Sequence, residues 1–129
     1  MKRLLFIAVI VLSHHPVHAS WVALEKEFQP TGRETVYFDP NTIHQEGKTA
    51  TLWQLTDIAW NSTTRFLSST THKEFDCEGS RVRVLQVIEF SREMGKGRSH
   101  AGYIQQGGWQ PVGAEGINHA LSKAACKRQ

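Results

Sequence analysis

The stretch RVRVLQVIEF, residues 81–90, decides the fold class of this chain of 129 residues. Alternate positions on one face of this segment are apolar, namely Val82, Val84, Ile88 and Phe90. The opposite face carries Arg81, Arg83 and Glu89, and Leu85 and Val87 interrupt it in the middle. Alternation with a period of two predicts a β-strand. Because only its middle is apolar on both faces, we expect this strand to lie in the middle of a curved sheet.

Other β-rich runs flank this strand and alternate with turn signals about every ten residues. The turn signals lie at residues 30–32, 39–41, 46–48, 78–80, 95–97 and 107–108. The predicted strands are residues 21–24, 35–38, 49–57, 66–75, 81–90 and 99–104. The run at 66–75 is rich in Ser and Thr, so we expect it to be largely exposed. Short connections between strands favour an antiparallel sheet.

The C-terminal segment changes from a strand period to a helical one. In residues 114–127, apolar side chains recur at helical spacing at Ile117, at Leu121 and at Ala124 or Ala125. Cys126 is well around the helix from Ile117, so it lies at the edge of the apolar stripe or in a frayed last turn. The sequence therefore predicts an α+β domain, a single antiparallel β-sheet of about six strands with a C-terminal helix.

Residues 1–19 have the organisation of a secretory signal peptide. Lys2 and Arg3 form a basic start, residues 4–12 are an unbroken apolar run, and the expected cleavage lies between Ala19 and Ser20. Such a run spans about 14 Å as a helix, too short for a bilayer core of about 30 Å. We therefore predict a mature domain of residues 20–129 without a transmembrane segment. No Cys lies near the cleavage point, so we expect a periplasmic, extracellular or cell-surface location without a lipid anchor.

Removal of the signal peptide lowers the net charge from its value of +3 for the whole chain. Lys2 and Arg3 leave without any acidic residue, so the mature domain has 13 basic and 12 acidic residues and a net charge of +1. Binding to a nucleic-acid backbone needs a strongly basic surface. We therefore do not expect nucleic acid to be a partner.

The chain has two cysteines, Cys77 and Cys126. In an oxidising compartment such a pair forms a disulfide far more often than a metal site or a nucleophile. We therefore predict a Cys77–Cys126 disulfide, and the chain-entropy model gives it a contribution of about 4 kcal/mol. This bond would tie the end of the helix to the turn that follows residue 75.

Motifs for catalysis and metal binding are missing from the sequence. The P-loop pattern and the nucleophile elbow G-x-S-x-G are absent. No metal-ligand spacing relates the four histidines of the mature domain, which are His44, His72, His100 and His119. Asp39, Asp57 and Asp76 would form an acid–base pair only if the fold brought two of them together, and turn hydrogen bonding is the commoner role. We expect no catalytic residues, no cofactor and no metal.

The most basic region spans residues 81–98. Its basic residues are Arg81, Arg83, Arg92, Lys96 and Arg98. One interpretation is a patch for an acidic partner, such as a glycosaminoglycan or an acidic protein surface. A solvated edge that discourages strand pairing is the commoner alternative. Trp21, Trp60 and Trp109 are candidate binding aromatics, although Trp in a small β domain more often lies in the core.

Seven short motifs follow one another along nearly the whole mature domain. They are V-Y-F-D at 36–39, L-W-Q-L-T-D at 52–57, E-F-D-C at 74–77, R-x-R at 81–83, M-G-K-G at 94–97, W-Q-P-V at 109–112 and the late Cys126. In this order they resemble the surface-adhesin protein E-like family. The resemblance implies an antiparallel sheet of about six strands with a C-terminal helix held against its concave side by the Cys77–Cys126 disulfide. It implies no catalytic residues, and it implies binding to host extracellular-matrix proteins, which the name-giving adhesin performs from the bacterial surface as a lipoprotein.

The leading hypothesis is an exported, non-enzymatic bacterial binding protein of the adhesin type, with a host extracellular-matrix protein or an acidic polysaccharide as its partner. The alternative is a small periplasmic inhibitor or envelope protein, for example one that blocks a cell-wall hydrolase. Such a protein would also be small, secreted and disulfide-bonded. An enzyme ranks third, because it would need a pocket with paired titratable groups.

Overall fold

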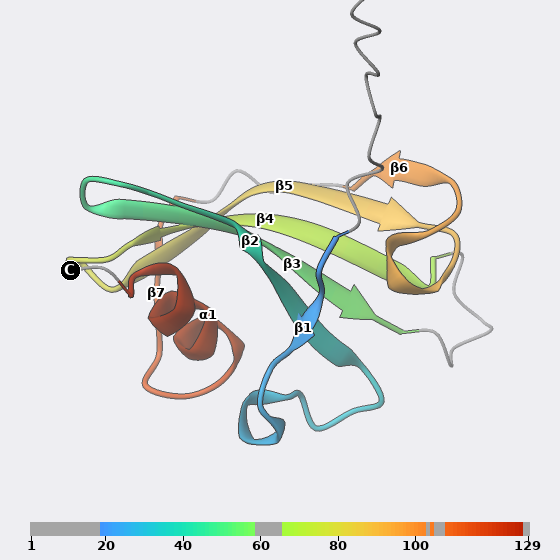
Figure 1. The fold of residues 1–129 in the computed structure, drawn as a ribbon, viewed down its shortest axis with the longest axis horizontal. Coiled ribbons are helices and arrows are strands. Elements are labelled where there is room, and N and C mark those ends of the chain that lie inside the picture. Colours follow the sequence, from blue (N-terminus) through green and yellow to red (C-terminus); the bar gives the residue numbers. More distant parts are fainter. Residues whose placement is uncertain (1–18, 59–65, 103, 105–107, 128–129) are drawn as a thin grey trace, which may run out of the picture.

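Consecutive antiparallel strands form one sheet, with the helix α1 beneath it, in the computed structural model of the chain (Figure 1). The structure describes residues 19–58, 66–102, 104 and 108–127. The elements are β1 (Val22–Ala23), the 3₁₀ helix η1 (Lys26–Phe28), β2 (Thr35–Glu46), β3 (Thr49–Asp57), β4 (Ser68–Asp76), β5 (Arg81–Phe90), the 3₁₀ helix η2 (Glu93–Gly95), β6 (Ser99–Ala101), β7 (Gln110–Pro111) and α1 (Ile117–Ala125).

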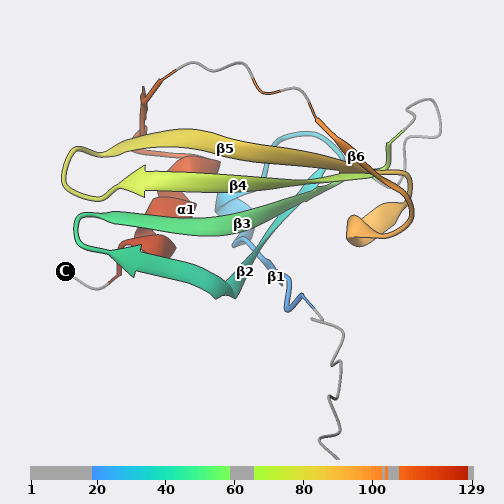
Figure 2. The same ribbon diagram turned by 90° about the horizontal axis from the view of Figure 1, so that it is seen from above.

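The strands pair in sequence order, β1-β2-β3-β4-β5-β6, and β7 pairs with the start of β5. Figure 2 shows β2 to β5 side by side, with α1 crossing behind them. The single antiparallel sheet and the C-terminal helix predicted from the sequence are confirmed. Two predicted strands, 49–57 and 81–90, have the observed bounds of β3 and β5.

The main core lies between the sheet and α1, on the concave face of the sheet (Figure 1). The helix contributes Leu121 and Ala125, and both are buried. The sheet and the segment before it contribute six buried residues, Leu24, Val36, Ala50, Leu52, Phe75 and Val82. Burial of one large apolar side chain contributes about 1.5–3 kcal/mol, so these few contacts carry much of the stability of the helix.

A disulfide between Cys77 and Cys126 joins the turn after β4 to the residue that follows α1. The two sulfur atoms are 2.10 Å apart and the two Cα atoms 5.6 Å apart. This confirms the predicted pairing. The helix runs from Ile117 to Ala125 and is shorter than the expected 114–127, because Gly116, with a φ of 86°, is a non-helical N-cap.

The sequence prediction of a turn at residues 39–41 was wrong in part, because β2 continues through it as a bulge. The pairing of β2 with β3 is interrupted between Asp39 and His44, where four residues of β2 face only one residue of β3. The local turn chemistry is nevertheless present. The carboxylate of Asp39 accepts a hydrogen bond from the backbone N–H of Asn41 at 2.9 Å. The hydroxyl of Thr42 accepts one from the N–H of Trp53 at 3.0 Å and so closes the bulge.

A second bulge makes the predicted faces of β5 wrong beyond its middle. Lys73 of β4 pairs with Val84, but the preceding His72 pairs with Gln86, so Leu85 is an extra residue on β5. A slip of one residue moves all following side chains to the other face. Val82 therefore faces α1, whereas Ile88, which pairs with Thr70, faces the opposite side. The strand also lies next to short edge strands and not in the middle of the sheet.

The expectation that residues 66–75 are largely exposed was wrong. Ser68, Thr70 and Phe75 are buried, and no residue of β4 is exposed. The hydroxyl of Ser68 donates to the carbonyl of Arg92 at 2.6 Å and accepts from the N–H of Gly95 at 2.9 Å. The η2 segment therefore covers the face of β4 opposite α1, and its backbone satisfies the buried hydroxyl of Ser68.

The remaining sequence expectations concern the two ends of the chain. The first and last predicted strands are shorter, β1 having two residues and β6 three, and β7 was not predicted.

Ala19 and Ser20 are exposed, whereas most of the predicted signal peptide lies outside the described residues, as does Trp60. In the part of the chain that the structure describes, no helix is long and apolar enough to cross a membrane.

Candidate functional site

The structure divides the five basic residues predicted as a patch into two groups at opposite ends of β5. Arg81 and Arg83 lie at its start, beside β7. The other three, Arg92, Lys96 and Arg98, lie in and around η2, between β5 and β6. Arg83 and Arg92 are separated by nine positions, which corresponds to about 30 Å along a strand. The five residues therefore form two separate surfaces.

The first group is held in place by carboxylates on the neighbouring strand. Arg81 is paired with Asp76 across β4 and β5, and its Nη2 donates to Oδ2 of Asp76 at 2.7 Å. Arg83 is paired in the same way with Glu74, and its Nε donates to Oε1 of Glu74 at 2.6 Å. Charge-assisted hydrogen bonds of this kind fix the direction of a guanidinium group. Both arginine side chains are nearly half exposed, at 49% and 44%.

Asp76 has further partners that keep it ionised. The N–H groups of Gly79 and Glu78 donate to its Oδ1 at 2.9 and 3.2 Å. The hydrogen bond from Gly79, and then that from Arg81, lowers the pKa of Asp76 below its ordinary value. The carboxylate is therefore charged at neutral pH and orients Arg81.

Trp109 lies against both guanidinium groups. The Cζ atoms of Arg83 and Arg81 are 4.5 and 5.2 Å from the centre of its ring. Both distances are within the range of a cation–π interaction. We call Trp109, Arg81, Arg83, Asp76 and Glu74 together the tryptophan corner. The positive charge of this corner is balanced by its own carboxylates, so it offers an ordered aromatic and hydrogen-bonding surface more than a net charge.

The same face of the sheet continues from the corner toward η2 with a second aromatic pair. Trp53 of β3 and His72 of β4 are cross-strand neighbours, and their rings stack at 4.6 Å with an angle of 5°. Burial lowers the pKa of His72, and the charge of nearby Glu74 opposes this effect. The imidazole is therefore neutral at pH 7, and the stack adds apolar surface beside the corner.

The second basic group, Arg92, Lys96 and Arg98, is called the basic hairpin below. Arg92 is 3.8 Å from Glu93, and most of its side chain is exposed. Among the described residues, no salt bridge involves Lys96 or Arg98. The backbone N–H of Arg92 donates to the carbonyl of Lys96, which closes the loop. The basic hairpin therefore carries uncompensated positive charge.

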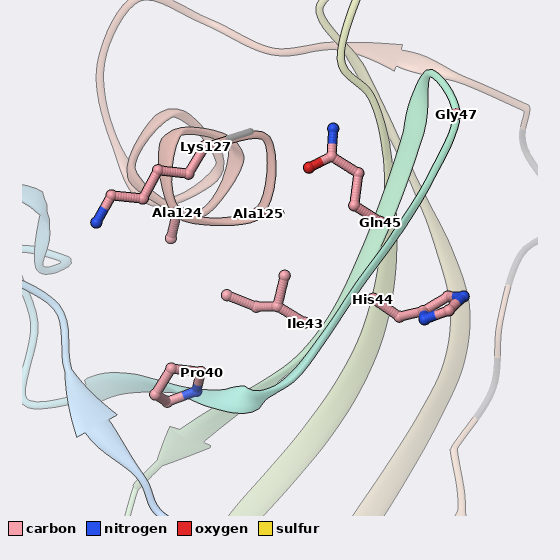
Figure 3. Close-up of a pocket in the computed structure, with 8 residues that line it drawn as sticks. All are labelled: Pro40, Ile43, His44, Gln45, Gly47, Ala124, Ala125 and Lys127. Carbon is pink, nitrogen blue, oxygen red and sulfur yellow. The ribbon is translucent and has the colours of Figure 1, made fainter. Parts of the chain in front are cut away.

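A cavity of about 670 Å³ lies between β2 and the end of α1, as Figure 3 shows. Ile43 points toward the helix, whereas the ring of His44 points away from it (Figure 3). The residues that line the cavity are Pro40, Ile43, His44, Gln45, Gly47, Ala124, Ala125 and Lys127. The described residues of this lining include no carboxylate, so among them there is no acid–base pair of the kind that hydrolysis needs.

Two of the three aspartates considered as an acid–base pair, Asp39 and Asp76, have local structural roles, whereas Oδ1 of Asp57 is buried without a hydrogen-bond partner among the described residues. Asp39 and Asp76 accept backbone hydrogen bonds within their own turns. Within the described ranges, no group of three or more His, Cys, Asp or Glu side chains is arranged to hold a metal ion. The tryptophan corner and the basic hairpin are the two candidate contact surfaces among the described residues.

A disulfide-tethered helix under a curved antiparallel sheet defines the class of this protein as a small α+β domain. The chain belongs to the surface-adhesin protein E family, because the family model described as surface-adhesin protein E matches residues 21–127. This agrees with the resemblance seen in the sequence motifs. No curated protein sequence matched the chain in a comparison.

Three solved structures of Haemophilus influenzae protein E share the fold. The first covers 83% of this chain and 83% of that chain, with 12% identity and a TM-score of 0.63. A selenomethionine form covers 83% and 85%, with 11% identity and a TM-score of 0.63. Crystal form II covers 71% and 80%, with 12% identity and a TM-score of 0.59. At these identities the likeness establishes the fold and not a shared ligand.

Sequence reasoning singled out Trp109 and the two arginines separately but missed that they form one cluster. It also missed their partners Asp76 and Glu74. The signal that links them is the register of β4 and β5, because each arginine lies directly opposite its carboxylate. Counting back from the turn between these strands pairs the same residues, since a tight hairpin fixes the register.

Proposed function

We propose that this chain is an exported, non-enzymatic binding protein of the adhesin type, and that the tryptophan corner is its contact surface. The observation that carries the proposal is the pair of guanidinium groups against the ring of Trp109, each held by a carboxylate. Trp and Arg are the residues most enriched among those that dominate binding energy at protein interfaces. Side chains that are already ordered lose less conformational entropy on binding.

The corner fits a host extracellular-matrix protein better than an acidic polysaccharide. A polysaccharide bound through net charge needs cations that are free to pair with it. Arg81 and Arg83 are already neutralised by Asp76 and Glu74, so aromatic packing and hydrogen bonds would provide most of the affinity. Binding at the corner should therefore depend only weakly on salt concentration.

The basic hairpin is the second candidate, for an acidic polysaccharide. The observation that favours it is that Lys96 and Arg98 have no salt bridge among the described residues. Binding there would weaken strongly between low and high salt, because exposed charges are screened over about 10 Å at 0.1 M. The two surfaces therefore differ in the salt dependence that they predict.

A solid-phase binding assay on the disulfide-bonded protein tests both surfaces. The immobilised ligands are laminin, vitronectin and heparin, and each is measured at low and high salt. One variant combines Arg81→Gln with Arg83→Gln, and its matched control combines Lys96→Gln with Arg98→Gln, so that both lose two positive charges. The proposal expects the first variant to lose at least tenfold in affinity for a matrix protein and the second to change less than twofold. Absence of saturable binding to all three ligands contradicts the adhesin function. A larger loss of affinity in the Lys96→Gln/Arg98→Gln variant than in the Arg81→Gln/Arg83→Gln variant would instead favour the basic hairpin as the contact surface.

Export is part of the proposal and rests on the signal-peptide pattern of residues 1–19. The Cys77–Cys126 disulfide supports it, because such bonds persist in oxidising compartments. N-terminal sequencing of protein from fractionated cells should give Ser20 as the first residue, and the fraction that contains it decides between the periplasm and the surface. Material that stays in the cytoplasm and begins at Met1 contradicts export.

A further inference from the structure

Lys73 is a cation placed on the inner side of the sheet. It lies two residues before Phe75 on β4, so both side chains point toward α1. Its Nζ donates to Oδ1 of Asn118, on the first turn of α1, at 2.7 Å. An ammonium group has three donors, and this bond uses one of them. Among the described residues, no carboxylate forms a salt bridge with Lys73.

A cavity of about 400 Å³ opens beside this ammonium group. Its described lining includes two cations, two amides and two apolar side chains, which are Lys73, Arg83, Asn118, Gln110, Val82 and Val84. The volume falls within the range of about 300–1,000 Å³ that is usual for small-ligand sites. Val84 is 40% exposed, so the cavity offers apolar surface that is not covered by the protein.

The electrostatics of the cavity favour an anion. Burial lowers the pKa of Lys73 to about 8, because the ammonium group has lost water without gaining a negative partner. The other charged group of the lining is Arg83, whose guanidinium is bound by Glu74. Glu74 itself lies on the opposite face of β4, one residue from Lys73. The lining from α1 and β7, Asn118 and Gln110, is uncharged.

We propose that this cavity binds a small organic carboxylate, with its carboxylate group on Lys73 and its apolar part against Val82 and Val84. A carboxylate fits better than inorganic phosphate, because phosphate is held best by forked Arg groups and the Arg83 fork is already occupied by Glu74. The apolar wall requires an organic body on the ligand. This site shares Arg83 with the tryptophan corner, but its proposed ligand is a small molecule and needs no macromolecular partner.

A ligand titration followed by NMR tests the proposal on the full disulfide-bonded protein. The probes are hexanoate and benzoate, with hexanamide as the uncharged counterpart and inorganic phosphate as the second anion. We expect saturable shifts of the methyl signals of Val82 and Val84 with the two carboxylates, and at least tenfold weaker binding of hexanamide and of phosphate. Equal binding of hexanamide, or no saturable shift with either carboxylate, overturns the proposal.

Two further measurements tie the binding to Lys73. Lys73→Gln should weaken the binding of hexanoate at least tenfold, whereas the matched control Lys96→Gln should change the affinity for hexanoate less than twofold. Between pH 7 and pH 9 the affinity of the unaltered protein should fall about tenfold, because the ammonium group loses its proton with a pKa of about 8. A pH-independent affinity overturns the proposal even if the Lys73→Gln protein does not fold.

Discussion

Loss of the disulfide is the perturbation whose magnitude follows most directly from the structure. The Cys77–Cys126 bond has a sequence separation of 49, and closing such a loop restricts the unfolded chain by about 4 kcal/mol in the entropy model. In the folded state the same bond holds an α1 of only nine residues, a length that is marginal for an isolated helix. Without the bond, the helix keeps the burial of Leu121 and Ala125 and the Lys73–Asn118 hydrogen bond. We therefore expect Cys126→Ser to lower the free energy of unfolding by about 2–5 kcal/mol and to loosen the helix on the sheet.

Urea denaturation under non-reducing conditions measures this loss. The double variant Cys77→Ser/Cys126→Ser is compared as well, because it leaves no free thiol to form bonds between molecules. Addition of a reducing agent to the unaltered protein is the control, and it should bring the midpoint to that of the double variant. Equal midpoints for the unaltered protein and the variants would show that the pair is not bridged in the native protein.

Three other changes test separate parts of the structure. Truncation before Ala114 should expose the concave face of the sheet and cause association in size-exclusion chromatography, and a soluble monomer would argue against the docked helix. Lys73→Met should stabilise the protein by up to about 3 kcal/mol below pH 8, because the folded-state pKa of about 8 lies below the ordinary 10.5. This gain should disappear as the pH rises from 8 to 10.5, because in this range the unfolded state binds more protons than the folded state. An equal difference in urea midpoint between the Lys73→Met variant and the unaltered protein at pH 7 and at pH 10 would contradict this reasoning. Gly97→Ala should destabilise by at least about 1 kcal/mol, because φ at Gly97 is 83° and its new Cβ would collide with the hydroxyl of Ser91. Gly32→Ala, which meets open space, is its control, and equal melting temperatures would contradict the strain.

The sequence was sufficient where local signals agree. Alternating apolar residues and the turn at 46–48 located β3 and β5 with their observed bounds. The helical stripe located α1, and the two cysteines predicted the disulfide. Each of these features depends on residues that are close in sequence or on a pair with no competing partner.

The bulges and the covered face of β4 could not be predicted in this way. Leu85 adds one residue to a strand whose alternation looks continuous in the sequence, and only its pairing with β4 reveals the slip. Ser68 looks like an exposed polar residue, yet the backbone of η2, more than 20 residues later, buries it and satisfies its hydroxyl. Such burial depends on long-range contacts that a pattern of single residues does not contain.

The candidate site was predicted in pieces for the same reason. Arg81, Arg83 and Trp109 were each candidates because of their residue type. The predicted continuous basic patch was wrong because the length of β5 separates its basic residues into two groups. The carboxylates that neutralise the two arginines belong to β4, and Trp109 comes from the segment before β7. The cluster therefore exists only through strand pairing.

The affinity of the Trp109→Ala variant for a matrix protein tests the central claim most directly. Its matched control is Trp53→Ala, which removes another tryptophan of the same sheet face from its stack with His72. Surface plasmon resonance on the matrix protein that binds most tightly should show an affinity about thirtyfold lower for Trp109→Ala and a much smaller loss of affinity for Trp53→Ala. The thirtyfold loss corresponds to about 2 kcal/mol, the effect of a residue at the centre of an interface. An unchanged affinity for Trp109→Ala, in a protein that still melts as a folded domain, would contradict the assignment of the tryptophan corner as the contact surface.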